Sequence, residues 1–192
     1  MVRKKGFNRI ALYSSHSSKD KEQVVNQCFE VLKHLSIPTV ISDNFKSQSL
    51  RGIKSVSDST IIKTCDLIIA VGGDGTMLSS SRKFGSKGIP VLGINMGKLG
   101  FLSDLGLDDL TQNLNEIVRG NFLTDNRFFI EASVNKSKPA QIAMNEVVLH
   151  SGAIAQMMEY ELFIDDKFVY QQKADGVIVS SPTGTTAYSL SG

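Results

Sequence analysis

The stretch LIIAVGGDGTMLSSS, residues 67–81, constrains the fold of this chain more than any other, because an unbroken apolar run leads directly into a glycine turn. A run of this kind predicts a strand that is covered on both faces, as in a parallel sheet. The segment 76–86 behind the turn predicts one helix that ends near Gly85 or Gly88. Strand, turn and helix in this order predict one repeating unit of an α/β fold.

The same alternation continues on both sides of this stretch. Strands are expected at 9–15, 37–42 and 89–97, and amphipathic helices where apolar residues recur at helical spacing, at Val25, Phe29, Leu32 and Leu35 and at Leu110, Leu114, Ile117 and Val118. The serine-rich segment 43–59 is expected to form a mobile loop. The sequence therefore predicts an N-terminal α/β domain over residues 1–122, built on a Rossmann-like parallel sheet.

After residue 122 the pattern changes to β-rich segments with alternating polarity. The tetrapeptide IDDK with the phenylalanine behind it, residues 164–168, is typical of a hairpin connection. Near the end, a strand runs into a Pro-Thr-Gly turn, and a helix is expected to begin at Thr185 or Thr186. Residues 123–192 are thus expected to form an all-β domain.

Composition excludes several classes of protein. A formal net charge of +2 and no long cluster of Lys and Arg argue against nucleic-acid binding. No apolar window is long enough for a signal peptide or a membrane span, so we expect a cytoplasmic protein without a membrane partner. Cys28 and Cys65 fit buried core positions, and the scattered His16, His34 and His150 show no metal-ligand spacing.

The glycine turn contains one acid, Asp74, and permits two interpretations. In the structural one, the turn simply joins strand to helix and Asp74 makes local hydrogen bonds. In the functional one, backbone N–H groups of the turn hold phosphate, and Asp74 accepts the proton of a hydroxyl that attacks a terminal phosphorus. The turn lacks the Gly-Lys-Ser/Thr of a P-loop and is not a GxGxxG motif, so this stretch alone favours neither interpretation.

Three further polar stretches follow predicted strands. NMGKLGFLSD, residues 95–104, is a second glycine-rich loop at a strand end, where ligands of open α/β sheets bind. In MNEVVLH, Asn145 and Glu146 suit the hydroxyls of a ribose, although alone they are better explained as the polar start of a strand. The hydroxyl cluster of SSPTGTTAYSLSG exceeds what helix capping needs.

Taken together and in this order, GGDGTML, GINMGKLGFLSD, MNEVVLH and DGVIVSSPTGTTAYSLSG resemble the NAD kinase family, and bacterial members most closely. GGDGT alone is also found in lipid kinases of the diacylglycerol and sphingosine type. The resemblance implies transfer of the terminal phosphoryl group of ATP to the 2′-hydroxyl of the adenosine ribose of NAD, which gives NADP. It also implies an N-terminal Rossmann-like domain and a C-terminal β domain.

The resemblance also implies roles for individual residues. Asp74 matches the general base and also contacts NAD. The expected NAD-binding set comprises Gly75, Phe101, Asn145, Glu146, Lys173, Asp175, Thr183, Thr186, Ala187, Tyr188, Ser189, Leu190 and Ser191. Gly72, Gly73, Gly75 and Thr76 are expected to bind phosphate. Gln156 stands where close relatives often have a basic residue, and it receives no role.

The resemblance further implies ATP, or in some members polyphosphate, as the phosphoryl donor, with a divalent ion such as Mg²⁺ whose protein ligands are not identified. Family members form homo-oligomers and continue beyond AYSLSG with a segment that completes the β domain. On this comparison the chain is expected to be truncated and its β domain incomplete. Two alternatives remain open, which are a fragment that binds NAD or NADP without transfer, and a lipid kinase with the GGDGT core.

Overall fold

The computed structural model describes residues 6–45, 50–97, 100–102, 105–135, 140–152 and 156–191. Its contacts divide the chain into two compact units, Met1–Asp125 and Asn126–Gly192. Each unit has its own set of sheets and is described separately.

The first unit is built on one five-stranded sheet in which every neighbouring pair of strands is parallel. Its strands are β1 (Ile10–Tyr13), β2 (Thr39–Ser42), β3 (Lys54–Val56), β4 (Leu67–Val71) and β5 (Val91–Ile94), in the spatial order β3-β2-β1-β4-β5. This order confirms the predicted Rossmann-like sheet.

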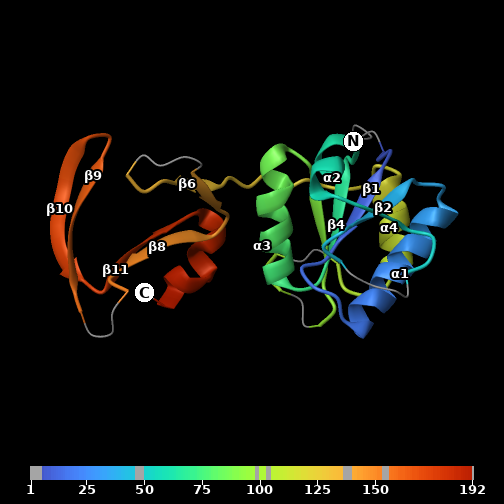
Figure 1. Ribbon diagram of the computed structural model, residues 1–192, viewed down its shortest axis with the longest axis horizontal. Coiled ribbons are helices and arrows are strands. Elements are labelled where there is room, and N and C mark those ends of the chain that lie inside the picture. Colours follow the sequence, from blue (N-terminus) through green and yellow to red (C-terminus); the bar gives the residue numbers. More distant parts are fainter. Residues whose placement is uncertain are drawn as a thin grey trace. The chain divides into compact units, whose positions relative to one another are not determined.

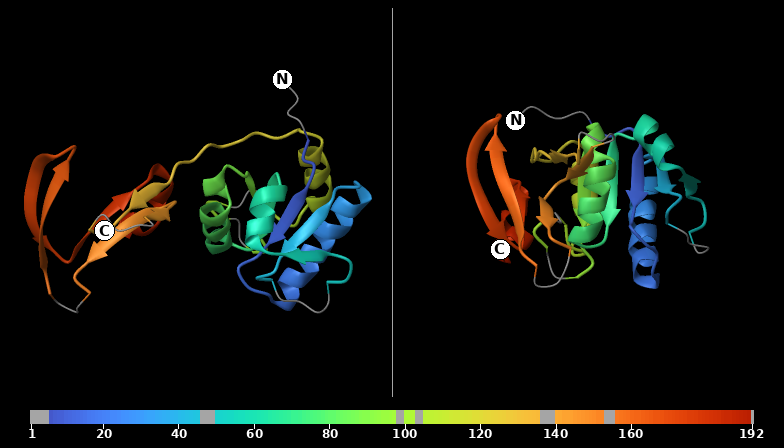
Figure 2. Two further views of the ribbon diagram at one scale, coloured as in Figure 1. Left: turned by 45° about the horizontal axis from the view of Figure 1, so that its top comes forward. Right: turned by 60° about the vertical axis from the view of Figure 1, so that its left-hand side comes forward.

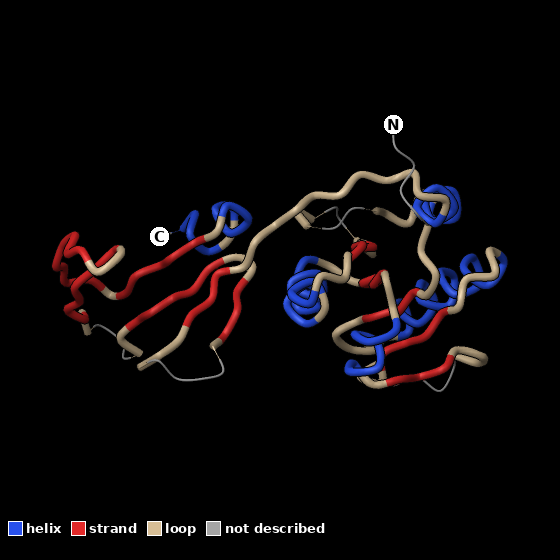
Figure 3. The backbone as a smooth tube through the Cα atoms, turned by 90° about the horizontal axis from the view of Figure 1, so that it is seen from above, coloured by secondary structure: helices blue, strands red, loops and turns tan. Residues whose placement is uncertain are grey.

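Helices cover both faces of this sheet (Figure 1). They are α1 (Lys19–His34), α2 (Asp58–Thr64), α3 (Asp74–Lys83) and α4 (Leu110–Val118). Alternate residues of a strand point to opposite faces, so Ile10 and Leu12 of β1 pack with α1 and α4, whereas Ala11 and Tyr13 pack on the face of α2. Figure 3 shows these helices around the strands of the first unit.

The predicted central strand lies in the middle of this core. All five residues of β4 are buried, and Ile68 and Ile69 have no exposed surface. Full burial of such a side chain contributes about 1.5–3 kcal/mol, which explains why the strand is apolar throughout. Cys28 and Cys65 are buried free thiols, as their patterns predicted.

The prediction of a loop over residues 43–59 is wrong for the part of that segment that the structure describes. β3 pairs in parallel with β2 at the edge of the sheet, and α2 begins at Asp58. The hydroxyl of Ser57 caps this helix by accepting from the N–H of Thr60 at 3.4 Å. Two serines of the predicted loop thus have other places in the fold. Ser55 belongs to the edge strand, and Ser57 caps a helix.

The second unit consists of three antiparallel strand pairs, shown in orange and red tones in Figure 2. The pairs join β6 (Ile130–Ala132) to β7 (Gln141–Ala143), β8 (Glu146–His150) to β11 (Gly176–Ser180) and β9 (Met158–Ile164) to β10 (Lys167–Ala174). Asp165 and Asp166, at φ 48° and 61°, form the turn between β9 and β10. Two positive φ angles are typical of a tight hairpin turn, so the predicted hairpin and β-rich region are confirmed.

The last helical segment begins earlier than predicted. Two short 3₁₀ helices occupy Pro182–Thr186 and Tyr188–Ser191, and the first is capped by Ser181 rather than opened by Thr185 or Thr186. Pro182 fits the first helical position because its missing N–H has no helical partner there. None of the helices among the described residues has the length and apolar character needed to cross a bilayer; α1 has 16 residues and alternates charge with apolar positions.

Candidate functional site

The strand order creates a switch point between β1 and β4. From β1 the chain proceeds outward to β2 and β3, and from β4 it proceeds the other way to β5. In open α/β sheets, ligands bind at the carboxyl ends of the strands where the order reverses. The segment behind β1 and the glycine turn behind β4 both lie at this edge, since β1 and β4 pair in register from Ile10↔Leu67 to Tyr13↔Ala70.

The glycine turn is held in a conformation that other residues would not tolerate. Gly72 has φ +152°, and a Cβ atom there would lie 2.3 Å from the Oγ1 of Thr76. The N–H of Gly72 donates to the carbonyl of Ile94 at 2.9 Å, which anchors the turn to the end of β5. α3 begins at Asp74, and no side chain among the described residues caps it at Gly73. The first N–H groups of α3 can therefore serve an anion.

Asp74 is oriented by the main chain of the neighbouring loop. Its Oδ2 accepts from the N–H of Phe101 and its Oδ1 from the N–H of Leu102, each at 3.1 Å. Gly100 makes room for this contact, because a Cβ atom there would lie 2.2 Å from Oδ1 of Asp74. The two glycine-rich stretches that the sequence singled out are thus brought together through the Asp74 carboxylate.

The expected nucleotide-facing residues of this unit are accessible. Gly73 and Gly75 are exposed, and the Phe101 side chain is 78% exposed. Thr76 is buried under the turn. The structure therefore places Asp74, Gly75 and Phe101 side by side, and it places Thr76 behind them as part of the turn's support.

Two of the motifs in the second unit are joined by hydrogen bonds. The N–H of Ser181 donates to the carbonyl of Asn145 at 2.8 Å, and the Ser181 hydroxyl donates to the carbonyl of Met144 at 2.5 Å. The hydroxyl of Ser189 donates to the carbonyl of Gly184 at 2.7 Å. The Asn-Glu pair at the start of β8 and the segment behind β11 consequently form one cluster.

Within this cluster, two side-chain oxygen atoms are buried without a partner. Oδ1 of Asn145 and Oε2 of Glu146 have no hydrogen bond to any of the described residues. A buried acceptor without a donor costs about 1–3 kcal/mol. Donors of a bound molecule, such as ribose hydroxyls, would satisfy both atoms.

The remaining predicted residues of the second unit are more dispersed. Lys173 belongs to β10 and Asp175 follows it, and the Asp175 carbonyl accepts from the N–H of Ser151 at 3.2 Å. Among the described residues, no hydrogen bond joins the Lys173 or Asp175 side chain to the cluster around Asn145. Thr183 accepts from Arg127 at 3.4 Å, and Tyr188 and Leu190 are 58% and 73% exposed.

One part of the site was missed by sequence reasoning. The Ser14 hydroxyl donates to the carbonyl of Val71 at 2.8 Å, and the Ser15 hydroxyl lies 3.2 Å from the hydroxyl of Thr76. The segment behind β1 is therefore in direct contact with the glycine turn. Only the adjacency of β1 and β4 could have indicated this, because nothing in the local sequence marks Ser15.

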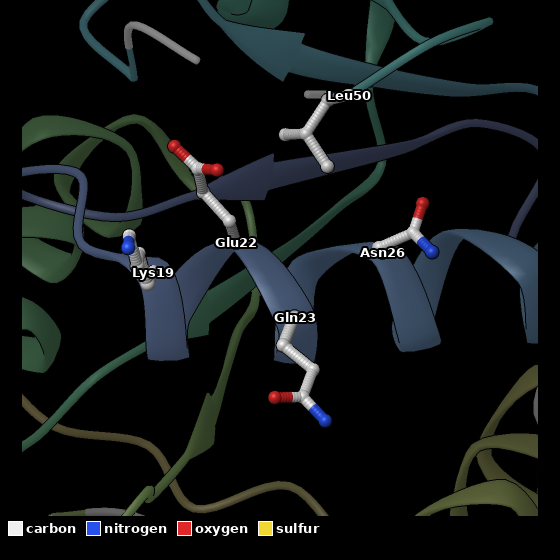
Figure 4. A pocket seen from close by; sticks show the side chains of 5 residues that line it. All are labelled: Lys19, Glu22, Gln23, Asn26 and Leu50. Atoms are coloured by element: carbon white, nitrogen blue, oxygen red, sulfur yellow. The ribbon is translucent and has the colours of Figure 1, made fainter. Parts of the chain in front are cut away.

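Two other features do not add to the site. No group of three His, Cys, Asp or Glu side chains that could hold a metal occurs in the described part of the chain. A shallow hollow beside α1, lined by Lys19, Glu22, Gln23, Asn26 and Leu50, contains none of the predicted site residues (Figure 4).

Comparison with known families identifies both units. The family model of the ATP-NAD kinase N-terminal domain matches residues 10–122, and the family model of the ATP-NAD kinase C-terminal domain matches residues 144–192. The chain belongs to the ATP-NAD kinase family. The resemblance inferred from the sequence is thereby confirmed.

Individual ATP-NAD kinase relatives agree. The NAD kinase of Shewanella piezotolerans is 52% identical over 188 residues, which are 96% of this chain and 61% of the relative. The NAD kinase of Shewanella loihica is 40% identical over 190 residues, which are 97% of this chain and 65% of the relative. The chain thus spans less than two thirds of the length of these curated relatives.

Solved structures of the family have the same fold. The crystal structure of yeast NADH kinase complexed with NADH has a TM-score of 0.77 at 26% identity, over 97% of this chain and 61% of that one. The NAD kinase from Archaeoglobus fulgidus in complex with ATP has a TM-score of 0.70 at 25% identity, over 95% of this chain and 64% of that one.

Proposed function

We propose that this chain carries the site that transfers the terminal phosphoryl group of ATP to the 2′-hydroxyl of the adenosine ribose of NAD, with NADP as the product. Membership of the ATP-NAD kinase family supports the reaction class. The names of two similar structures, one with NADH and one with ATP, support a dinucleotide acceptor and a nucleoside triphosphate donor.

The observation that carries this proposal is the orientation of Asp74. Two backbone N–H groups fix its carboxylate beside a glycine turn suited to phosphate. A carboxylate can accept from more than one donor at each oxygen, so these contacts orient the group and still permit it to accept from a substrate hydroxyl. Asp74 then takes the proton of the 2′-hydroxyl as that oxygen attacks the terminal phosphorus of ATP, and the bond from this phosphorus to its bridging oxygen breaks, so that ADP leaves.

The remaining residues bind and orient in this proposal. Gly72, Gly73, Gly75 and Thr76 hold phosphate, through N–H groups and the first turn of α3. Asn145 and Glu146 accept from hydroxyl or amino groups of NAD, and Phe101 and Tyr188 offer exposed rings to a base. Further contacts to NAD are proposed for Lys173, Asp175, Thr183, Thr186, Ala187, Ser189, Leu190 and Ser191.

A divalent ion such as Mg²⁺ would neutralise charge on the transferred phosphoryl group. Because the described residues contain no three-ligand cluster, the protein ligands of such an ion are not assigned, and no step is derived through it. Inorganic polyphosphate is the alternative donor.

The test is formation of NADP by this chain with NAD, ATP and Mg²⁺, compared with the Asp74→Asn variant. Loss of a positioned base should lower turnover by roughly 10²–10⁴-fold, and NAD binding measured by calorimetry should survive. Asp43→Asn is the matched control, because this exposed acid follows β2, two strands away from β4 and its glycine turn, and the change should leave turnover unchanged.

Other outcomes separate the alternatives. Bound NAD without any product from the wild-type chain would favour a binding fragment that does not catalyse transfer. Transfer of phosphate to diacylglycerol vesicles instead of NAD would overturn the proposed acceptor. Equal losses of binding and turnover in Asp74→Asn would argue against its role as a base.

A further inference from the structure

We infer that Ser15, His16 and Lys21 extend the glycine turn into a binding site for the phosphate chain of the phosphoryl donor. That the phosphate chain belongs to a donor rests on the proposed function. The anion site itself rests on contacts within the first unit alone.

The first step is the contact between two loops at the switch point of the sheet. The Ser15 hydroxyl meets the Thr76 hydroxyl at 3.2 Å, and His16 follows Ser15 directly. Ser15 and His16 are exposed, so a ligand at the glycine turn has access to them. The segment at the carboxyl end of β1 thus forms one side of any binding site at the first turn of α3.

The second step is a chain of hydrogen bonds with a defined direction. Nζ of Lys21 lies 3.2 Å from Nε2 of His16, and Nδ1 of His16 lies 3.0 Å from the Ser15 hydroxyl. An ammonium can only donate, so Nε2 of His16 is the acceptor and its ring carries the proton on Nδ1. That proton is donated to Ser15, whose own hydrogen remains for Oγ1 of Thr76. Lys21 is therefore linked to the glycine turn through neutral groups.

The third step is the charge of Lys21. The described residues offer no carboxylate within 4.0 Å of its ammonium group, and the three ion pairs among them involve other lysines and arginines. Burial lowers the pKa of Lys21, as expected for an ammonium that loses water without gaining an anion. A bound phosphate would supply that anion and use the donors that His16 leaves.

Two acids of the same helix, Asp20 and Glu22, flank Lys21, and neither forms one of the ion pairs among the described residues. Each of them is one position away from Lys21, which turns its side chain by about 100° around the helix. Glu22 lines the hollow beside α1 together with Leu50, and Lys21 does not line it (Figure 4). Since α1 and α3 both begin at the carboxyl edge of the sheet, the positive ends of their dipoles add to the attraction for phosphate.

The test is calorimetric titration of the chain with inorganic tripolyphosphate, which contains the phosphate chain without a nucleoside and requires no turnover. Lys21→Met should weaken binding roughly tenfold, since one hydrogen bond to a charged group is lost. His16→Ala should weaken it by a smaller factor, because Lys21 then loses the group that holds it. Lys63→Met removes an equal charge from the end of α2, where β4 begins, and should leave binding unchanged.

Circular dichroism and a thermal melt of each variant show that it is folded. Binding by Lys21→Met as tight as that of the wild type, an equal loss in Lys63→Met, or no binding by the wild-type chain at millimolar tripolyphosphate would each overturn the inference. The result is separable from the proposed function, because Lys21-dependent binding without NADP formation would leave the anion site standing and remove only the reaction.

Discussion

At the scale of single residues, the position of the Asp74 carboxylate depends on the absence of one atom. Gly100 precedes the two residues whose N–H groups hold that carboxylate. Because Gly100 has no Cβ, the backbone of its loop can approach the Asp74 carboxylate closely.

Gly100→Ala should therefore reduce activity without reducing stability. The new Cβ would lie 2.2 Å from Oδ1 of Asp74, and the atom that can yield is the end of a side chain. A displacement of about 1 Å of a reacting group can cost roughly 10²-fold in rate, so, with Asp74 as the proposed base, we expect NADP formation to fall by that order. Thermal unfolding should stay within about 0.5 kcal/mol of the wild type.

Gly97→Ala is the matched control for this variant. It makes the same chemical change in the same loop, and a Cβ atom at Gly97 meets nothing within 4 Å. If Gly97→Ala lowered turnover as much as Gly100→Ala, the contact with Asp74 would not be the cause.

At the scale of elements, one ion pair ties α2 to the end of α3. Nζ of Lys83 donates to Oδ2 of Asp58 at 2.6 Å, and the Ser42 hydroxyl donates to Oδ1 at 2.8 Å. Burial would raise the pKa of Asp58, but the hydrogen bonds from Lys83, Ser42 and Asn44 and the charge of Lys83 outweigh it, so the pKa is lowered. The helix that starts at Asp58 is in this way held against the end of α3.

Lys83→Met should lower the free energy of unfolding by about 1–2 kcal/mol near neutral pH, with the partial exposure of the pair taken into account. Because the folded pKa of Asp58 lies below its unfolded value, the stabilisation is complete above that unfolded value, near about 4, and is lost as the pH falls through the folded pKa. Urea unfolding of both proteins at pH 7 and pH 3 measures this. A difference that persisted in acid would mean that Lys83 stabilises by packing on Tyr13, whose ring lies 5.3 Å from Nζ.

The sequence predicted the elements whose own residues show a clear apolar pattern. It missed those that form only because another part of the fold lies beside them. β4 and α1 follow from their own apolar spacing. The role expected for Asp74 came from the resemblance to the NAD kinase family, because its glycine turn alone favoured neither interpretation. β3 is three residues long and exists because β2 offers it an edge, which no pattern within Lys54–Val56 reveals. His16 looked like a scattered surface histidine because its contact with Lys21 of α1 and, through Ser15, with Thr76 of α3 forms only in the folded chain.

At the scale of the whole molecule, the two units differ in how their backbone is protected. β1 and β4 are central strands with buried side chains on both faces. β9 and β10 form a sheet of two strands, and seven of the eight residues of β10 are exposed. An isolated pair of strands is marginally stable in water.

Hydrogen exchange followed by mass spectrometry should therefore show a steep gradient along the chain. We expect amides of β1 and β4 to exchange roughly 10³-fold more slowly than those of β9 and β10, because local opening costs far less than global unfolding. Equal protection in both regions would show that another surface covers the hairpin in solution.

The pairing of β1 with β4 has a consequence for how the chain reaches its native state. Ser14 and Val71, which this pairing brings together, are 57 positions apart, so their contact closes a long loop and belongs to the slow, non-local events of folding. The edge proposed to bind phosphate cannot form before that closure. The time at which a refolding chain first binds a polyanion would therefore report when β1 pairs with β4. Binding before the rest of the chain has folded would show that this pair belongs to an early folding nucleus.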